Sequence, residues 1–379
     1  MISENIMAAK SIKNIVQDLL KNADVTIDGN RPWDIQVNNE GFYSRILSDG
    51  SLALGESYMD GWWECNAIDQ LIDRIIRANL HKKITSTREI IWSLIKTRLM
   101  NQQRLSKAFE IGKHHYDIGN DLFINMLDKR MNYSSAYWKN VRTLDDAQEA
   151  KLDLTCKKLK LSKGMRVLDI GCGWGSFAIY AAEKFRVSVV GITISKEQVS
   201  LVSELHNRLD IEIKLMDYRD LNDKFDRIVS IGMFEHVGHK NHRRFFEVVN
   251  RCLNEDGIFL LHTIGGNTSA TTTDPWINKY IFPNSLIPSA HQITKASEGL
   301  LKLEDWHNFG ADYDKTLMSW YANFHKNWQT IKPSYSDRFY RMWKYYLLSC
   351  AGSFRAQHNR LWQIVFSKLA SQIYYDSVR

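Results

Sequence analysis

The chain has 379 residues, 44% of them apolar, and a formal net charge of +7. This composition excludes a disordered or fibrous protein, and the length exceeds one typical domain, so a second and smaller unit is expected. Five scattered cysteines without a C-x-x-C pair exclude a zinc ribbon and a disulfide scaffold, and neither a signal peptide nor a membrane-spanning apolar run is present. We therefore expect a cytoplasmic protein that meets a membrane only from outside.

Residues 1–80 are predicted to form a small, mostly helical amino-terminal domain. Apolar spacing indicates helices at 12–20 and 68–76 and a short strand-like stretch at 25–27. We interpret this domain as a candidate for lipid or membrane association.

A basic helical linker is predicted at 81–108. Between His81 and Lys113 there are eight Lys or Arg residues against two acidic ones, and the apolar residues of 90–99 fall on one helical face. This pattern fits a basic amphipathic helix at a membrane surface, and equally a solvated linker helix that packs on its own domain. Nucleic acid is not favoured as a partner, because no recognition-helix, RNP or zinc-finger signature accompanies the charge.

The stretch 167–195 predicts a strand, a glycine turn, a helix and a second strand, within a catalytic domain expected to span 109–379. The turn carries Gly171, Gly173 and Gly175, which removes every Cβ where a ligand would come close. This order of elements implies a right-handed crossover and a parallel sheet, with the ligand at the carboxyl ends of the strands. The alternative is that the glycines only allow close packing of the helix on the strand.

The glycine spacing also indicates which nucleotide the turn suits. A dinucleotide site has G-x-G-x-x-G and an acidic residue about 20 positions later, whereas this chain has G-x-G-x-G and ends the second strand with Gly191 and Thr193. Asp169, just before the turn, would repel phosphates and suits a cationic ligand such as S-adenosylmethionine. Asp217 follows a third apolar run at 211–216 and is expected to accept a hydrogen bond from the adenine amine.

Two further strands are predicted within 225–238 and 257–266, each with polar residues after its apolar run. The polar residues expected at the same rim of the sheet as the glycine turn are Glu235, His236, His262 and Thr263. Ligands of open α/β sheets bind at this rim. No metal site is expected, because the histidines of the string EHVGHKNH fall on different helix faces and Gly238 interrupts them.

Many segments contribute to a resemblance. They are HYDIGNDLF (115–123), NYSSAYW (132–138), VLDIGCGWG (167–175), GITIS (191–195), FDRIVSIGMFEHVG (225–238), LLHTIG (260–265), DPWINKYIFPN (274–284), DWHNFGADYDKTL (305–317) and SCAGSFRA (349–356). Together they resemble the cyclopropane fatty acyl phospholipid synthases over nearly the whole chain, whereas mycolic acid cyclopropane synthases look similar over the catalytic part only. The resemblance implies a Rossmann-like, class I SAM-dependent methyltransferase fold with a lipid-site insertion, and a homodimer.

The resemblance implies an activity as well. Such enzymes transfer a methylene group from S-adenosyl-L-methionine to the cis double bond of unsaturated acyl chains in membrane phospholipids, forming a cyclopropane ring. The alkene attacks the sulfonium methyl, and the carbocation must then lose a proton in a dry tunnel. A protein base risks being methylated, and the family uses bound bicarbonate. By resemblance, its ligands are Ser135, Glu235, His262, Ile264 and Tyr313. Glu235 should then be protonated or act through a hydrogen-bonded His262.

Two positions leave alternatives open. The family usually has cysteine where this chain has Ser135, but serine should suffice if the position binds the anion through its main-chain N–H. Retained activity is therefore expected, and the alternatives are a catalytically inactive lipid-binding protein and a methyltransferase acting on a soluble substrate. Cys350 matches a cysteine sometimes designated the family's active-site residue, although its apolar helical setting also fits a buried small hydrophobe.

The resemblance also carries over the cofactor contacts. It places Tyr133 and Ser134 at the methionine end, Thr193 and Gln198 at the ribose, and Asp217 with Tyr218 around the adenine. The full set expected at the cofactor is Tyr133, Ser134, Asp169, Gly171, Gly173, Gly191, Thr193, Ile194, Ser195, Gln198, Asp217 and Tyr218. Lys279 and Arg355 are candidate partners for lipid phosphate at the inner face of the membrane, with ordinary surface charges as the alternative.

Overall fold

The computed structural model describes residues 2–80, 119–196, 198–199 and 209–379. The chain divides into two compact units. The amino-terminal unit comprises Met1–Met126, Asp274–Pro283 and Leu317–His358. The sheet unit comprises Leu127–Thr273, Asn284–Thr316 and Asn359–Arg379.

These units differ from the segments expected along the sequence, where 109–379 formed one catalytic domain. Residues 274–283 and 317–358 instead cluster with the amino-terminal residues. The reason is helix packing, since α15 (Asp337–Arg355) contacts α3 and α4 and α12 (Pro275–Tyr280) contacts α3. The predicted basic linker at 81–108 lies outside the described residues.

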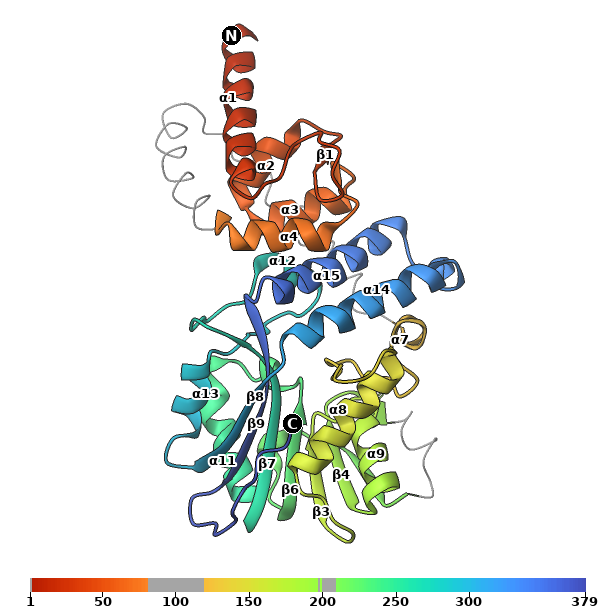
Figure 1. Ribbon diagram of the computed structural model, residues 1–379, viewed down its shortest axis with the longest axis vertical. Coiled ribbons are helices and arrows are strands. Elements are labelled where there is room, and N and C mark those ends of the chain that lie inside the picture. Colours follow the sequence, from red (N-terminus) through yellow and green to blue (C-terminus); the bar gives the residue numbers. More distant parts are fainter. Residues whose placement is uncertain (1, 81–118, 197, 200–208) are drawn as a thin grey trace. The chain divides into compact units, whose positions relative to one another are not determined.

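The sheet unit contains a sheet whose described strands run in the order β5-β4-β3-β6-β7-β9-β8 (Figure 1). They are β3 (Arg166–Ile170), β4 (Ser188–Thr193), β5 (Ile211–Leu215), β6 (Phe225–Ile231), β7 (Leu253–Gly266), β8 (Leu301–Asn308) and β9 (Asn359–Lys368). The first five in this order are parallel, and β9 runs antiparallel to both β7 and β8. The predicted parallel α/β fold and its strands are confirmed, whereas the antiparallel edge pair was not predicted.

Helices cover both faces of this sheet (Figure 1). One face carries α8 (Leu144–Lys158) and α9 (Ser176–Phe185), and the other carries α11 (His242–Cys252) and α13 (Ala290–Ser297). Because successive strand residues point to opposite faces, Val167 packs in the core beside α8 and α9, and Leu168 packs in the core beside α11 and α13. Thr143 caps α8 by accepting a hydrogen bond from the Asp146 N–H at 3.2 Å.

The amino-terminal unit is mostly helical, as predicted. Its elements include α1 (Ile2–Lys21), α2 (Gly41–Asp49), α3 (Ser51–Met59), α4 (Ile68–Arg77), α7 (Asn120–Met126), α12, α15, most of α14 (Ala311–Ile331), and the strand pair β1 (Gln36–Val37) and β2 (Trp63–Glu64). The predicted helices at 12–20 and 68–76 lie within α1 and α4. The strand-like stretch at 25–27 makes only an isolated bridge between Ile27 and Ile35.

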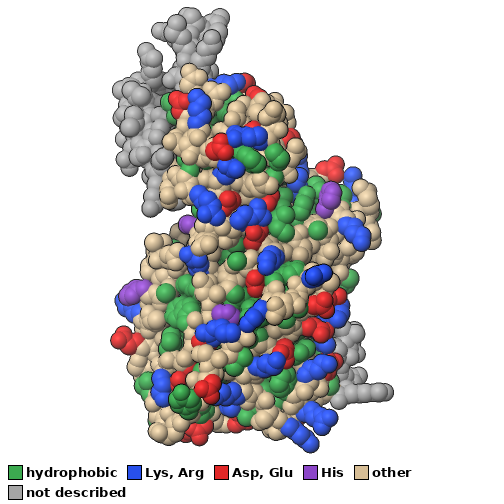
Figure 2. Space-filling view, in the orientation of Figure 1, with side chains coloured by type: hydrophobic (Ala, Val, Ile, Leu, Met, Phe, Trp, Pro, Cys, Tyr) green, Lys and Arg blue, Asp and Glu red, His purple; other side chains and the backbone are tan. Residues whose placement is uncertain are grey.

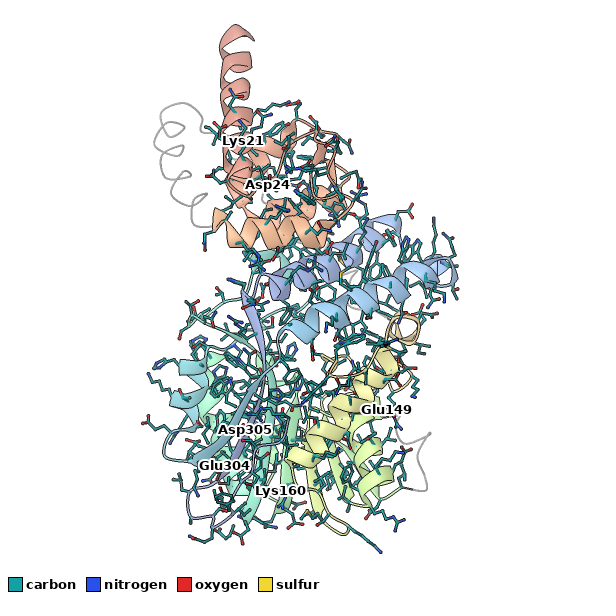
Figure 3. All side chains as sticks on the ribbon, in the orientation of Figure 1. Lys21, Asp24, Glu149, Lys160, Glu304 and Asp305 are labelled. Carbon is teal, nitrogen blue, oxygen red and sulfur yellow. The ribbon has the colours of Figure 1, made fainter. Side chains whose placement is uncertain are left out.

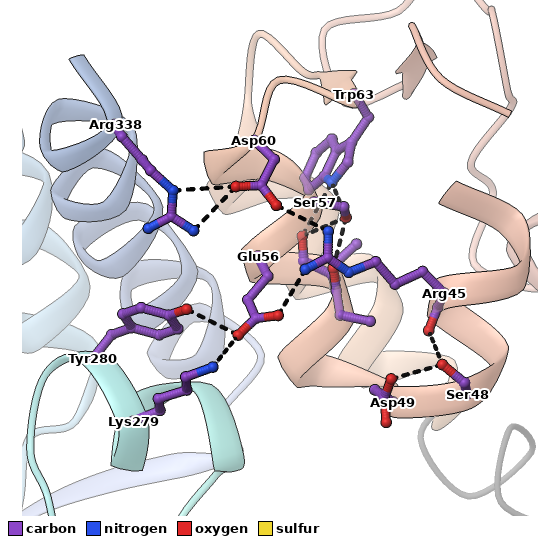
Figure 4. A network of polar contacts seen from close by, with 12 residues as sticks. Arg45, Ser48, Asp49, Glu56, Ser57, Asp60, Trp63, Lys279, Tyr280 and Arg338 are labelled. Carbon is purple, nitrogen blue, oxygen red and sulfur yellow. Dashed lines mark hydrogen bonds and ion pairs between the residues drawn. The ribbon is translucent and has the colours of Figure 1, made fainter. Parts of the chain in front are cut away.

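Ion pairs join residues 274–283 and α15 to the rest of the amino-terminal unit (Figure 4). Glu56 of α3 accepts hydrogen bonds from Lys279 at 2.6 Å and from Arg45 at 2.7 Å. Arg355 pairs in the same way with Asp69 of α4. Lys279 and Arg355, considered above for lipid phosphate, are therefore already paired with carboxylates of their own unit.

The carboxyl-terminal segment is tied to β8 and α8 in the sheet unit. Asp305, labelled in Figure 3, accepts hydrogen bonds from Arg379 through both carboxylate oxygens, each at 2.6 Å, and from Ser377 at 3.0 Å. Lys160, just after α8, donates to the Tyr374 carbonyl at 3.0 Å. These contacts fix the residues that follow β9.

The surface and the helices bear on membrane contact. No helix among the described residues is long and apolar enough to cross a membrane. Figure 2 shows Lys and Arg side chains interspersed with Asp and Glu side chains over the visible face, so the charge of that face is mixed in sign.

Candidate active site

Two glycines at the ends of neighbouring strands, one just after β3 and one in β4, leave no room for a side chain. Gly171 has φ +82°, and a Cβ there would lie 2.7 Å from the Cβ of Met233. A Cβ on Gly191 of β4 would lie 2.6 Å from Cδ1 of Ile213. Gly173 also has a positive φ, +55°, but apart from its own chain neighbours no described atom lies within 4 Å of its Cβ position. At Gly173 the turn therefore presents bare backbone to open space, as a site for close approach of a ligand requires.

A cleft of about 320 Å³ opens at the carboxyl ends of β3, β4 and β5. Its lining residues are Ile170, Gly171, Ile192, Thr193, Ile194, Met216, Asp217, Tyr218, Arg219, Met233, His236, Val237 and Asn241. Those that the sequence predicted at the cofactor are Gly171, Thr193, Ile194, Asp217 and Tyr218. Mostly apolar walls with a few convergent polar groups are typical of a small-molecule site.

Asp217 lies just after β5, and Arg219 holds its carboxylate. Arg219 Nε donates to Oδ1 at 2.9 Å and Nη2 donates to Oδ2 at 2.6 Å. The Arg219 guanidinium holds the pKa of Asp217 below its usual range. Asp217 is therefore a charged acceptor at the cleft, and an adenine amine would share it with Arg219.

Residues predicted at the ribose meet at the end of β4. The Thr193 hydroxyl donates to Oε1 of Gln198 at 2.6 Å and accepts from the Ser195 N–H at 3.1 Å. Ser195 Oγ in turn accepts from the Gln198 N–H at 3.3 Å. The three side chains thus form one local network beside the cleft, next to Ile194, whose side chain is exposed.

Side chains of α8 hydrogen-bond to the segment that carries Tyr133. Lys151 donates to Oδ1 of Asn132 at 2.9 Å and to Oγ of Ser134 at 3.0 Å, and Gln148 donates to the Ser134 carbonyl at 2.8 Å. All four polar partners are buried. Tyr133 is half-buried between the two anchored residues, so α8 fixes the backbone on which this predicted cofactor residue is placed.

Lys151 is a buried cation opposite a buried carboxyl. Burial lowers the pKa of Lys151 to about 8, and burial raises the pKa of Asp169 to about 7. Attraction to Asp128 and then to Asp169 opposes the shift of Lys151, and attraction to Lys151 opposes that of Asp169. Asp169 does not line the cleft described above, and the charge that acts on it is that of Lys151.

Ser135 is fully buried, and its hydroxyl donates to the Ala136 carbonyl at 3.1 Å. The next residues connect to the first turn of α14. The Ala136 N–H donates to the Thr316 hydroxyl at 3.1 Å and the Trp138 N–H donates to Asp312 at 2.9 Å. Tyr313, between these two acceptors in the chain, is thereby brought to the segment that holds Ser135.

Glu235 lies in the short helix η2 (Phe234–His236), just past the end of β6. Its Oε1 accepts a hydrogen bond from the Ile264 N–H at 2.6 Å, while Oε2 is buried and accepts none from a described residue. Burial raises the pKa of Glu235 to about 7, against the opposing effect of the Ile264 N–H. The Ile264 N–H, expected from the resemblance to contact an anion, thus positions Glu235 in this structure.

His262 of β7 is also buried, and burial lowers its pKa well below the usual range. Its Nδ1 lies 3.3 Å from Nε2 of Gln363, and its Nε2 meets no hydrogen-bond partner within the described chain. Among the described residues no hydrogen bond joins Glu235 to His262, because Glu235 is held by the Ile264 N–H and His262 by Gln363. Phe309 packs edge-on against the His262 ring, with ring centroids 5.8 Å apart.

Cys350 lies on α15 in the amino-terminal unit, while Glu235 and His262 belong to the sheet unit. Burial raises the pKa of the Cys350 thiol to about 12. The reactive thiolate is therefore strongly disfavoured, and the setting fits a packing residue better than a nucleophile.

Several buried polar residues of the site were not predicted. They are Gln148, Lys151, Thr155 and Gln363. The first three share one helix face, but polar residues at helical spacing normally face water. The pattern became informative only because the structure buries that face against the sheet.

Comparison with known proteins places these residues in context. A family model described as mycolic acid cyclopropane synthetase matches residues 103–364. The chain is 54% identical over 354 residues to the cyclopropane-fatty-acyl-phospholipid synthase of Escherichia coli (strain K12), covering 93% of each chain. Two solved structures, each 33% identical with a TM-score of 0.63, cover 70% of this chain and 100% of their own. They are the cyclopropane synthase MmaA2 from Mycobacterium tuberculosis and the mycolic acid cyclopropane synthase CmaA1 complexed with SAH and CTAB.

Proposed function

Because this chain belongs to the mycolic acid cyclopropane synthetase family, we propose that its substrates are unsaturated acyl chains of membrane phospholipids. It is an S-adenosylmethionine-dependent methyltransferase, and it adds a methylene group across a cis double bond to close a cyclopropane ring. The observation that carries the proposal is the 54% identity to the Escherichia coli phospholipid enzyme over 93% of both chains. That match includes the amino-terminal part, which lies before the region matched by the family model.

The cleft beside the glycine turn fits S-adenosylmethionine. When bound, this donor supplies the transferred carbon as its sulfonium methyl group. Gly171 and Gly173 offer main chain without side-chain obstruction, Asp217 offers a charged acceptor, and Ile194 and Tyr218 offer apolar and aromatic surface. These residues would hold the adenosine, while Tyr133 and Ser134 would face the methionine end.

Ring closure releases a proton in an enclosed site, and the residues around Glu235 fit a small bound anion. Bicarbonate, when bound there, would supply the base. Two buried polar atoms, Glu235 Oε2 and His262 Nε2, make no hydrogen bond to a described residue and would serve as its partners, together with Tyr313. Burial favours the protonated, neutral form of Glu235, which removes the repulsion between a carboxylate and bicarbonate.

Serine in place of the usual cysteine is compatible with this proposal. The Ser135 hydroxyl donates to the main chain at Ala136, so the side chain is not arranged as a nucleophile. Alkene methylation needs no covalent enzyme intermediate. Ser135 would therefore contribute through its main-chain N–H.

We also propose that the enzyme reaches lipid from the cytoplasmic membrane surface and works as a homodimer. The formal net charge of +7 favours attraction to anionic phospholipid. Co-sedimentation with anionic liposomes should fall as salt rises, and analytical ultracentrifugation of the full chain should give twice the monomer mass.

The deciding experiment incubates the purified chain with S-adenosylmethionine and liposomes of unsaturated phospholipid, followed by mass spectrometry of the released acyl chains. The expected product gains one CH2 as a cyclopropane ring, and liposomes of saturated phospholipid serve as the control. Activity should fall in carbonate-free buffer and return with added bicarbonate. Absence of product from a chain that still binds S-adenosylmethionine and liposomes would reject the proposed substrate.

A further inference from the structure

One face of α8 carries a buried row of polar side chains. Its members are Gln148, Lys151, Thr155 and Lys158, all at most 1% exposed. Their spacing of three, four and three residues places them on one side of the helix. Burial of four polar side chains is costly unless each is satisfied, so the contacts of this row indicate what it is for.

Three neighbouring strands of the sheet each carry a polar residue at the same register position. The register pairs His262 of β7 with Gln363 of β9, and Gln363 with His307 of β8. Gln363 is completely buried at the centre. Its Nε2 lies 3.0 Å from Oγ1 of Thr155 and 3.3 Å from Nδ1 of His262. A single amide therefore joins the polar face of α8 to the histidine of the site.

The direction of these hydrogen bonds follows from Thr155. A hydroxyl has one proton, and that of Thr155 is donated to the Lys151 carbonyl at 2.8 Å. The Thr155 hydroxyl must then accept a hydrogen bond from Gln363. The amide nitrogen of Gln363, and not its oxygen, must therefore face Thr155. The same nitrogen meets Nδ1 of His262, so Nδ1 must accept as well. The ring proton of a neutral His262 is thereby assigned to Nε2.

We propose that Gln363, oriented by Thr155, is a positioning residue that fixes His262 in the Nε2–H tautomer, so that His262 enters the reaction as a hydrogen-bond donor. This inference rests on the proposed function, in which His262 faces the anion that takes the proton. With the opposite tautomer, Nε2 would present a lone pair to that anion and repel it.

The surroundings of His262 keep its imidazole neutral. Lys151 and Lys158 both oppose a positive charge on His262, in addition to burial. A neutral imidazole carries a single ring proton, and its position is then set by hydrogen bonding alone. The reversed amide would place Oε1 of Gln363 against His262 and would require the Thr155 hydroxyl to leave the Lys151 carbonyl.

The tautomer is measured by 15N NMR of the full chain labelled at histidine nitrogens, with the His262 signals identified by their loss in His262→Asn. The wild type is expected to show a protonated Nε2 and an unprotonated Nδ1. Gln363→Glu supplies a carboxylate that accepts from Nδ1, so the proton should move to Nδ1. Its kcat should fall about a hundredfold or more, as expected when a catalytic histidine is held in the wrong form, while KM for S-adenosylmethionine changes less than about twofold.

Thr155→Val tests the same link without introducing a charge, should Gln363→Glu fail to fold. Removing the hydroxyl frees the amide to rotate, so both tautomers should appear and kcat should fall about tenfold. Ser367→Ala is the matched control, because Ser367 is buried on the same strand but bonds to Glu304. It should leave the His262 spectrum and kcat unchanged.

The outcomes separate this inference from the proposed function. A wild-type spectrum with the proton on Nδ1 would overturn the inference, as would variants that change the tautomer without lowering kcat. Absence of lipid turnover by the wild type would reject the proposed function. The spectra, recorded without lipid, would still support or contradict the control of the tautomer by Gln363.

Discussion

The two faces of the sheet formed by β3 to β9 are both buried under helices, but they are filled differently. Beneath α11 and α13, aromatic rings pack on one another, with Phe246 edge-on to Phe259 and Phe366. Beneath α8, Lys151 and Thr155 bond to polar groups of the strands and of the Asn132–Ser134 segment. Both faces contain an apolar core that stabilises the fold, and the face under α8 additionally holds the polar groups that we assign to chemistry.

This difference has an energetic basis. An apolar side chain contributes roughly in proportion to the area it buries and needs no specific partner atom. A buried polar side chain contributes only when its partners stand at defined distances, and an unpaired one costs about 1–3 kcal/mol. A polar face therefore constrains geometry in a way that an apolar face does not, and the predictions below test that distinction.

The largest effect is expected at Glu235, the buried carboxyl of the candidate site. Glu235→Gln retains an oxygen to accept from the Ile264 N–H but removes the acidic proton. The rate at which acyl chains of liposomal phospholipid are converted should fall at least a thousandfold. The Kd for S-adenosylmethionine and the Tm at pH 6 should stay nearly unchanged. A collapse of the Tm would return Glu235 to a structural role.

The next effect compares the two faces directly. Lys151→Met breaks the buried contacts to Asn132 and Ser134 and should lower the free energy of unfolding by about 3–5 kcal/mol. Phe246→Ala, on the face under α11, should lower it by about 3–5 kcal/mol as well. Only Lys151→Met should also lower kcat, by about tenfold, measured at a temperature where both variants are folded. Equal losses of kcat would remove the distinction between the faces.

The raised pKa of Glu235 predicts a dependence of stability on pH. Between its ordinary pKa of 4.5 and the folded value of about 7, the unfolded chain releases this proton before the folded chain does. The free energy of unfolding therefore falls as pH rises through this window, by about 3 kcal/mol in total. Glu235→Gln lacks this contribution, so the Tm of the variant should rise relative to the wild-type Tm as the pH is raised from 5 to 8. A constant difference in Tm would contradict the raised pKa.

The smallest effect is expected at Cys350, which belongs to neither face. Because burial disfavours its thiolate, Cys350→Ala should keep kcat within about twofold of wild type and lower the free energy of unfolding by about 1 kcal/mol. Loss of turnover with S-adenosylmethionine binding intact would restore a catalytic role for this thiol.

Local patterns predicted much of the sheet unit. The glycine spacing at 171–175 and the apolar runs on either side identified β3, α9 and β4, because each signal lies within a few neighbouring residues. The same patterns placed Thr193, Asp217 and Glu235 near the carboxyl edge of the sheet. The resemblance to a known family, rather than the patterns, supplied the reaction and the role of Ser135.

Patterns of this kind could not divide the chain into its units. The helices at 274–283 and 317–358 associate with residues that precede 126, and their apolar spacing does not indicate which helices they pack against. The pairing of Lys279 with Glu56 joins residues more than two hundred positions apart. Such contacts depend on which helices pack together, and helix packing depends on side-chain surfaces that form only when the chain folds.

The sequence by itself determined the parallel α/β core, the glycine turn and the acidic and histidine residues at its edge, because these follow from local spacing and residue chemistry. Only the tertiary structure decided how those residues are held. Thr155 and His262 meet at Gln363 because β9 inserts between β7 and β8 and α8 covers that face. The positions of the protons in this site depend on hydrogen bonds between distant segments, and those exist only once strand order and helix packing are set.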